Sequence, residues 1–305
     1  MSSDVTSQGG SDELTVERGA TVPADPAISI VVMSIDSNPF SGEAIDSLLA
    51  QKSPAEIILV NTGKDTLRNF LGERLAKIVL IESRQKRLPG GTRNLGLLQA
   101  HAPVIAFLAA DGLAVPGWIA ARLSAHAEGA EAVASALLPA PDASGSVSAA
   151  SLAMFAFLHS RRWPGAAPEH APRYGASYLR STLDRIGPFR EDLRIGEDTE
   201  MNGRLAAPPV WCREVLTLQR YPATAAEVWH DAAERAHLNF EWNRERRRPP
   251  LLRAIWRVPS GMRNAAAYFM NADRQTRAAL LRAAPLIVWI ALASAFGAVR
   301  AALRR

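Results

Sequence analysis

The sequence predicts an α/β protein with a mainly parallel sheet flanked by helices, followed by a basic helical extension at the C-terminal end. Three observations predict this fold class. Short β-branched runs alternate with helical patterns between residues 28 and 108, as in successive β–α units. Hydrophobic residues make up 48% of the 305 residues and charged residues 21%, which allows a packed core and excludes whole-chain disorder. Finally, arginines are concentrated near the C-terminus.

The expected strands are short and rich in Val, Ile and Leu, as strands buried on both faces are. They span residues 28–33, 56–60, 77–81 and 103–108, and helical patterns cover 42–51, 66–75 and 91–100. Further along, 148–160 is a helix or a strand, and helices are expected over 199–205 and 223–248. Ligands of such sheets lie outside the carboxyl ends of the strands. Candidate site residues are therefore expected in segments 34–38, 61–65, 83–87 and 109–112.

Composition divides the chain into three expected parts. Residues 1–27 are polar and predict a flexible leader, residues 28–245 an α/β domain, and residues 246–305 a basic, partly apolar helical tail. The start of the chain has no basic n-region and no apolar stretch, so we expect a cytoplasmic protein. A single cysteine, Cys212, excludes an intramolecular disulfide framework and a cysteine-based zinc site.

Five short segments follow one another in a specific order, although each is weak by itself. They are VVMSID at 31–36, VNTG at 60–63, GGTRNLG at 90–96, FLAADG at 107–112 and GEDTE at 196–200. Together they resemble the family 2 glycosyltransferases, inverting enzymes of the GT-A type, over about residues 28–205. The resemblance implies a Rossmann-like GT-A sheet and transfer of a sugar from a nucleotide-sugar donor to a glycan or lipid-linked acceptor.

The resemblance also assigns roles to six residues. It places Asp111 as the ligand of Mg²⁺ or Mn²⁺, which neutralises the diphosphate leaving group, and Arg93 beside the diphosphate and nearby carboxylates. Asp198 receives the role of general base for the acceptor hydroxyl, and Glu197 that of orienting the acceptor or the loop. Asp36 and Asn61 are expected to contact the nucleotide.

Four of these residues have a structural alternative, and that of Asp36 is a carboxylate in an ordinary turn. Asp111 starts an Asp–Gly turn, Asp198 is placed to cap the helix that follows, and Arg93 is a candidate surface arginine at a helix start. The chain also departs from the family pattern, because Ala109 stands where an Asp is usual and Asn61 replaces a strand-end Asp. These departures leave open a non-catalytic GT-A-like protein that binds a nucleotide or a partner. A dinucleotide oxidoreductase is disfavoured, because no G-x-G-x-x-G follows the first strand.

The C-terminal tail carries the positive charge of the chain. Residues 244–305 hold thirteen arginines and two acidic residues, a net charge of +11, whereas the total for the chain is only +5. The run 285–299 has no charge and is short for a membrane span. We expect the tail to bind peripherally at the cytoplasmic face of a membrane. The alternative is that it packs on the domain of its own chain or on a second copy of the protein. Nucleic-acid binding is not expected, since nothing resembles a DNA- or RNA-reading module.

Overall fold

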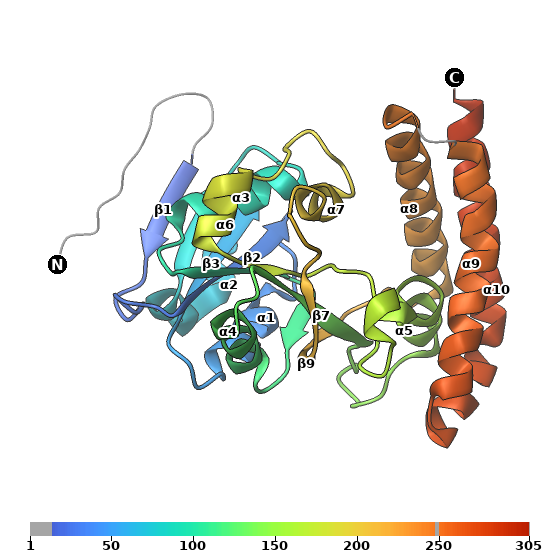
Figure 1. Ribbon diagram of the computed structural model, residues 1–305, viewed down its shortest axis with the longest axis horizontal. Helices are drawn as coiled ribbons and strands as arrows, with labels where there is room; N and C mark the ends of the chain where they lie inside the picture. The colour runs from blue at the N-terminus through green and yellow to red at the C-terminus, as the bar shows by residue number, and fades with distance from the viewer. Residues whose placement is uncertain (1–13, 248–249, 305) are drawn as a thin grey trace. The chain divides into compact units, whose positions relative to one another are not determined.

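The computed structural model describes residues 14–247 and 250–304, and these form two compact units (Figure 1). The first unit contains the described residues up to Ala136 together with Arg173–Thr217. The second contains Leu137–Pro172 and the described residues from Leu218 onward. The division therefore differs from the expected boundary at residue 245, because residues 137–172 and 218–245 belong with the C-terminal helices.

One sheet of nine strands runs through the described chain in the order β1-β4-β3-β2-β5-β8-β7-β9-β6. The strands are β1 (Leu14–Arg18), β2 (Ile28–Ile35), β3 (Ala55–Thr62), β4 (Val79–Ser83), β5 (Val104–Ala109), β6 (Gly112–Ala114), β7 (Ala132–Pro139), β8 (Ser177–Leu179) and β9 (Val210–Gln219). β2 pairs in parallel with β3 and β5, and β3 with β4. β8 is antiparallel to β5 and β7. The predicted α/β fold class is confirmed.

Helices cover the sheet in the first unit. They are α1 (Ser41–Leu49), α2 (Arg68–Leu71), α3 (Pro89–Gln99), α4 (Trp118–Ala127), α6 (Arg180–Ile186) and α7 (Glu197–Asn202). Alternate residues of β2 enter different cores: Ile30 packs with α1 and Trp118, whereas Val31 packs with Phe107 and Tyr178. Both sheet faces are thus buried, which explains why the parallel strands are continuous hydrophobic runs.

The N-terminal segment differs from the expected leader. Residues 14–18 form β1, an edge strand that pairs antiparallel with β4, from Leu14 opposite Ser83 to Arg18 opposite Val79. Arg18 also donates to the buried carboxylate of Glu56 (2.7 Å). Backbone pairing and this ion pair order a segment whose polar composition suggested flexibility. Residues 1–13 lie outside the described chain.

Two segments, 66–75 and 148–160, contain shorter α-helices than their sequence patterns. The segment 66–75 contains only the four-residue α2 before a 3₁₀ turn, Gly72–Lys77, since Gly72 adopts a positive φ of 53°. The segment 148–160 begins as α5 (Ala149–Met154) and widens into a π-helical turn, Phe155–His159. Three-residue β8 had no recognisable strand pattern at all.

The second unit is helical. Its long helices α8 (Ala225–Glu245), α9 (Pro250–Asn271) and α10 (Arg274–Leu303) lie side by side (Figure 1). Their core includes Phe157, Val228 and Ile290. Gly297 of α10 allows a close approach to α8, because a Cβ at this position would lie 2.0 Å from the carbonyl oxygen of Ala233.

Candidate active site at the carboxyl edge of the sheet

The loops after β2 and β3 meet at the carboxyl edge of the parallel strands. The backbone N–H of Asp36 donates to the carbonyl of Thr62 (2.9 Å). Asp36 and Ser37 both have positive φ angles, 51° and 54°. Such angles are uncommon for residues other than glycine and are found where the surrounding structure imposes them. The turn after β2 is therefore held in one conformation by its neighbours.

Asn61 is one of the residues that hold this turn. Its Oδ1 accepts from the N–H of Ser37 (3.1 Å) and from Ser34 Oγ (3.2 Å), and its Nδ2 donates to the carbonyl of Asp65 (2.8 Å) and to Ser37 Oγ (3.2 Å). The residue is 1% exposed. Asn61 joins two loops, and its amide provides the donors that a carboxylate there would lack. Its direct contact with a nucleotide stays a prediction.

Asp36 lies in the same turn but is partly exposed, and Lys86 donates to its carboxylate. Lys86 belongs to the loop after β4, so the pair joins the ends of two strands. The contact of Asp36 with a nucleotide stays a prediction. Lys86 had not been assigned any role, because a lysine fifty residues away carries no local signal of this pairing.

Asp111 lies between β5 and β6 and is partly buried. The preceding N–H, that of Ala110, donates to the carbonyl of Met33 at the end of β2 (2.9 Å). Asp111 therefore lies just after the carboxyl end of β5 and beside the end of the adjacent parallel strand β2. In residues 14–247 and 250–304, no group of three or more His, Cys, Asp or Glu side chains is arranged to hold a metal.

The GGTRNLG segment forms the start of α3, and its residues bind neighbouring segments. Thr92 Oγ1 and Thr62 Oγ1 form a hydrogen bond of 3.2 Å, which ties α3 to the end of β3. Asn94 exchanges hydrogen bonds with the backbone of Phe189, accepting from its N–H (3.0 Å) and donating to its carbonyl (2.9 Å). Gly90 permits this approach, because a Cβ would lie 2.1 Å from the carbonyl oxygen of Arg190.

Arg93 extends from α3 to α7 and donates to the carboxylate of Glu197. Both side chains are largely buried, with 15% and 9% of their surfaces exposed. Burial disfavours the charged guanidinium, but the carboxylates of Glu197 and Asp198 outweigh it and raise the pKa of Arg93. The arginine is therefore a buried cation between two acids, and its expected pairing with carboxylates is seen here.

Asp198 lies in the first turn of α7, where an acidic side chain is favourable near the helix N-terminus. The residue that caps the helix is Gly196, so Asp198 does not occupy the capping position that was its structural alternative. Its Oδ1 accepts from the N–H of Thr199 (2.7 Å). Burial and the nearby charge of Asp198 raise the pKa of Tyr178, whose hydroxyl donates to Asn202 Oδ1 (2.6 Å).

A buried polar cluster supports β8, the strand that carries Tyr178. Arg122 donates to Ser177 Oγ (2.9 Å) and to the carbonyl of Gly175 (2.8 Å), and its guanidinium stacks on Trp118, 3.9 Å from the ring centroid. His126 Nε2 also lies 2.8 Å from Ser177 Oγ. Burial and the charge of Arg122 lower the pKa of His126. Neither residue stood out in the sequence, because both lie inside an ordinary amphipathic helix.

A mainly parallel sheet, acidic residues at its carboxyl edge and a Glu–Asp pair held against the edge by α3 define a GT-A-type glycosyltransferase domain. The chain belongs to glycosyl transferase family 2, since the model of that family matches residues 29–187. The prediction from the ordered motifs is thus confirmed for family and fold. No curated protein matches the sequence.

Two solved structures are similar to the chain in fold, with low sequence identity. A mannosyltransferase, PcManGT from Pyrobaculum calidifontis in complex with GDP-Man and Mn²⁺, is 18% identical, with a TM-score of 0.55 over 93% of this chain and 89% of that one. TarS 1–349 of S. aureus in complex with UDP-GlcNAc is 14% identical, with a TM-score of 0.49 over 90% of this chain and 91% of that one. At such identities the first similarity establishes the fold, and the second adds nothing to it.

Proposed function

We propose that the protein is an inverting glycosyltransferase that moves a sugar from a nucleotide-sugar donor to a glycan or lipid-linked acceptor in cell-surface polysaccharide synthesis. The arrangement of Asp198 carries this proposal. Inversion needs one base that removes the proton of the acceptor hydroxyl while its oxygen attacks the anomeric carbon. A partly exposed carboxylate beside a buried arginine, at the ligand-binding edge of the sheet, suits that role.

The proposed mechanism gives a separate role to each of four side chains. The carboxylate of Asp198 takes the acceptor proton as the C–O bond to the acceptor forms and the bond to the diphosphate breaks. Glu197 holds the Arg93 guanidinium, which keeps a positive charge next to Asp198 and the start of α7. Asp36 contributes a carboxylate toward the donor nucleoside, and Asn61 keeps the turn that presents Asp36 in shape.

The residues present fit a divalent cation that is bound together with the donor. Asp111 offers one carboxylate, and Mg²⁺ or Mn²⁺ commonly binds through one or two carboxylates plus substrate phosphates and water. When bound, such a cation neutralises the charge that develops on the leaving diphosphate. With no three-ligand group in the described chain, we expect the ion to bind weakly without the nucleotide.

Helix α10 supports association with a membrane surface. By length and composition, it is the one helix of the described residues that is able to cross a membrane, although 44% of its most apolar window is buried. Large apolar side chains are exposed along this helix and recur at helical spacing. They are Leu281, Val288, Trp289, Leu292, Phe296, Val299 and Leu303. Exposed arginines flank them, including Arg274 and Arg304.

The packing of α10 on α8 favours a helix that lies on the membrane surface over one that crosses the bilayer. The buried face of α10 packs on α8, which carries Asp231, Glu234 and Arg235. Charges on an adjacent helix are costly at the centre of a bilayer. Arginines near an anionic cytoplasmic leaflet each add about 1 kcal/mol of attraction. We therefore propose a peripheral enzyme at the cytoplasmic face.

A donor screen tests the proposed activity. The purified protein is incubated with a panel of nucleotide sugars and Mn²⁺ or Mg²⁺, and release of the nucleoside diphosphate is measured with and without candidate acceptors. We expect one donor to be used, with inversion seen by NMR of the product. Asp198→Asn should retain donor binding and lower transfer about 10²–10⁴-fold. Binding of a donor without release or transfer by the wild type would instead identify a non-catalytic relative.

A further inference from the structure

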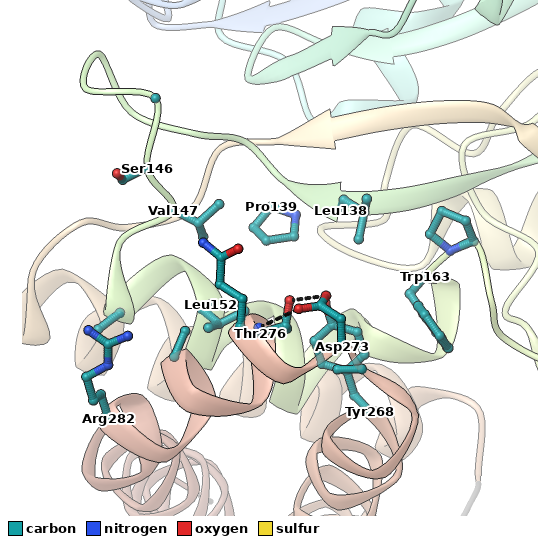
Figure 2. A pocket seen from close by; sticks show the side chains of 16 residues that line it. Leu138, Pro139, Ser146, Val147, Leu152, Trp163, Tyr268, Asp273, Thr276 and Arg282 are labelled. Carbon is teal, nitrogen blue, oxygen red and sulfur yellow. Dashed lines mark hydrogen bonds between the residues drawn. The ribbon is translucent and has the colours of Figure 1, made fainter.

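A groove in the second unit is lined by residues to which no role has been assigned. Its volume is about 790 Å³, within the range of roughly 300–1,000 Å³ for small-molecule sites. Figure 2 shows Leu138 and Pro139 from the end of β7 on one side and Leu152 of α5 and the start of α10 on the other. The lining is mainly apolar, as expected of a site for a ligand with little polarity.

Aromatic rings form one end of the groove. Trp163 and Tyr268 pack edge to face, with ring centroids 5.6 Å apart, and Tyr268 packs in the same way on Phe155 (5.2 Å). Phe155 is fully buried, so these rings rest on a fixed support. Rings held in this way give a rigid apolar wall that binds a hydrocarbon without losing side-chain freedom.

Charged residues lie at other positions along the groove, and Figure 2 shows Arg282 at the end away from Trp163. Asp273, the acidic lining residue, is the N-cap of α10: its Oδ1 accepts from the N–H of Thr276 (2.9 Å) and its Oδ2 from Thr276 Oγ1 (2.7 Å). Both carboxylate oxygens of Asp273 therefore accept hydrogen bonds from Thr276 in the first turn of α10. Arg282 uses Nε to donate to the carbonyl of Ala278 (3.3 Å), one of the five donors of a guanidinium.

Arg282 also borders the apolar face of α10 that we propose to contact the membrane. It lies seven residues, or about two turns, before Trp289, so the two side chains project from nearly the same side of the helix. Trp289 is 41% exposed. The cationic end of the groove is therefore next to the surface on which a bilayer would rest, and a lipid has a short path from one to the other.

From these features we propose that the groove holds the hydrocarbon chain of an amphiphile whose phosphate group pairs with Arg282. The apolar volume accepts the chain, and the guanidinium matches the phosphate in charge and geometry. This inference rests on the proposed function, and it selects a lipid phosphate or lipid-linked sugar over a free glycan as the acceptor.

Calorimetry of the full chain with alkyl phosphates tests the proposal without any sugar donor. Decyl phosphate, used below its micelle-forming concentration, should bind at least 100-fold more tightly than inorganic phosphate and than decanol. Binding of octyl, decyl and dodecyl phosphates should strengthen with chain length, by at most about fourfold per methylene at full burial. An increase that stops at one length would report the depth of the groove.

Variants separate the groove from general binding to a basic apolar surface. Ala279→Trp fills the groove and Arg282→Gln removes the cation, and each should weaken decyl phosphate binding at least tenfold. Val147→Trp, on a loop, fills the groove without altering a helix and replaces Ala279→Trp if that variant unfolds. Arg274→Gln removes a charge from the same end of α10 outside the groove and should leave binding within twofold.

Equal binding by the filled variants and the wild type would overturn the proposal, as would no binding of any alkyl phosphate by the wild type. Binding of inorganic phosphate as tight as that of decyl phosphate would mean that the site takes a free anion, and would also overturn it. Nucleotide-sugar binding is measured on the same preparation. If it is intact while alkyl phosphates fail, the groove assignment is wrong and the proposed glycosyltransferase function stands.

Discussion

Arg93 of α3 and Glu197, the first residue of α7, form a buried ion pair although they are 104 positions apart in the chain. Because Thr92 ties α3 to the end of β3, the pair fixes α7, and with it Asp198, against the carboxyl edge of the sheet. The position of the proposed base, Asp198, therefore depends on the ion pair that the preceding residue, Glu197, forms with Arg93 of α3.

Removal of one partner of this pair should destabilise the fold. Arg93→Gln leaves the Glu197 carboxylate buried and uncompensated, a change that typically costs about 3–5 kcal/mol. Urea unfolding measures the loss. Arg185→Gln, which breaks an exposed pair with Glu131, is the control and should cost no more than about 1 kcal/mol. A double-mutant cycle with Glu197→Gln that gives no coupling energy would contradict the pairing.

Asn61→Asp, which restores the acid usual in the family, should be harmful here. The carboxylate loses the two amide donors to Asp65 and Ser37 and gains a charge in a buried position. We expect a loss of stability of roughly 1–3 kcal/mol and weaker donor binding, because the turn that carries Asp36 relaxes. Chemical unfolding and calorimetry with the donor measure the two effects. Tighter donor binding with unchanged stability would favour a direct contact of residue 61 with the nucleotide.

Acid should weaken the fold partly through Glu56. Burial opposes ionisation of this side chain, but hydrogen bonds from Ser29, Arg18 and His101 outweigh it, and the pKa of Glu56 is lowered. Its contribution to stability is thus complete above the unfolded pKa of about 4.3 and is lost as the pH falls through the lower folded pKa. In Glu56→Gln, the free energy of unfolding should depend less on pH between about pH 5 and 3. If the pH dependence of the free energy of unfolding is unchanged in Glu56→Gln, Glu56 does not contribute to acid destabilisation.

Membrane binding should have a salt-sensitive and a salt-resistant part. In sedimentation with anionic vesicles, bound protein should decrease as salt screens the arginines but should not disappear, since apolar burial is unaffected by screening. Leu292→Ser and Phe296→Ser, on the exposed face of α10, should weaken the salt-resistant part several-fold. Ser294 is buried on the opposite side, so Ser294→Ala is a matched change that should leave vesicle binding intact. Loss of all binding at high salt would contradict an apolar contact.

Gly297→Ala should reverse the usual effect of this substitution in a helix. In a helix interior alanine is normally favoured over glycine by about 1 kcal/mol. Here the added Cβ meets the Ala233 carbonyl and forces α10 away from α8, at a cost of roughly 1–3 kcal/mol. Thermal unfolding should show a lower Tm. Ala295→Gly, on the exposed face, should cost only the usual preference, and a higher Tm for Gly297→Ala would show that the helices are less closely packed.

The four parallel strands were predictable because burial on both faces makes each of them an uninterrupted hydrophobic run. β1 was not, since a short edge strand depends on its partner β4 and on the Arg18–Glu56 pair for its order. β8 was missed for a similar reason: three residues are ordered by pairing on both sides. Strand order beyond β5 likewise depends on contacts that no local pattern encodes.

For the site, sequence motifs indicated candidate functional residues but not what each one touches. Asn61 occupies a strand end, yet its partners come from two other loop positions, and only the fold shows that its amide is fully engaged. Asn94 was part of the recognised motif without a role, and its partner Phe189 is 95 residues away. Tyr178 and Arg122 belong to no recognised motif. Their hydrogen bonds join residues that are far apart in the sequence, so no local pattern predicts them.

The division of the second unit between two stretches of chain affects the order in which the protein is completed during synthesis. Phe155 and Phe157 lie in its first stretch, but Ile290 and Ala293 of α10, which enclose the same core, are made about 130 residues later. At about 5–20 residues per second, the earlier segment waits roughly 7–30 s for its partner. The first unit is complete at Thr217 and is able to fold in that interval. The newborn chain thus exposes the apolar face of α5 and of the turn after it until α10 has been made and packs on them.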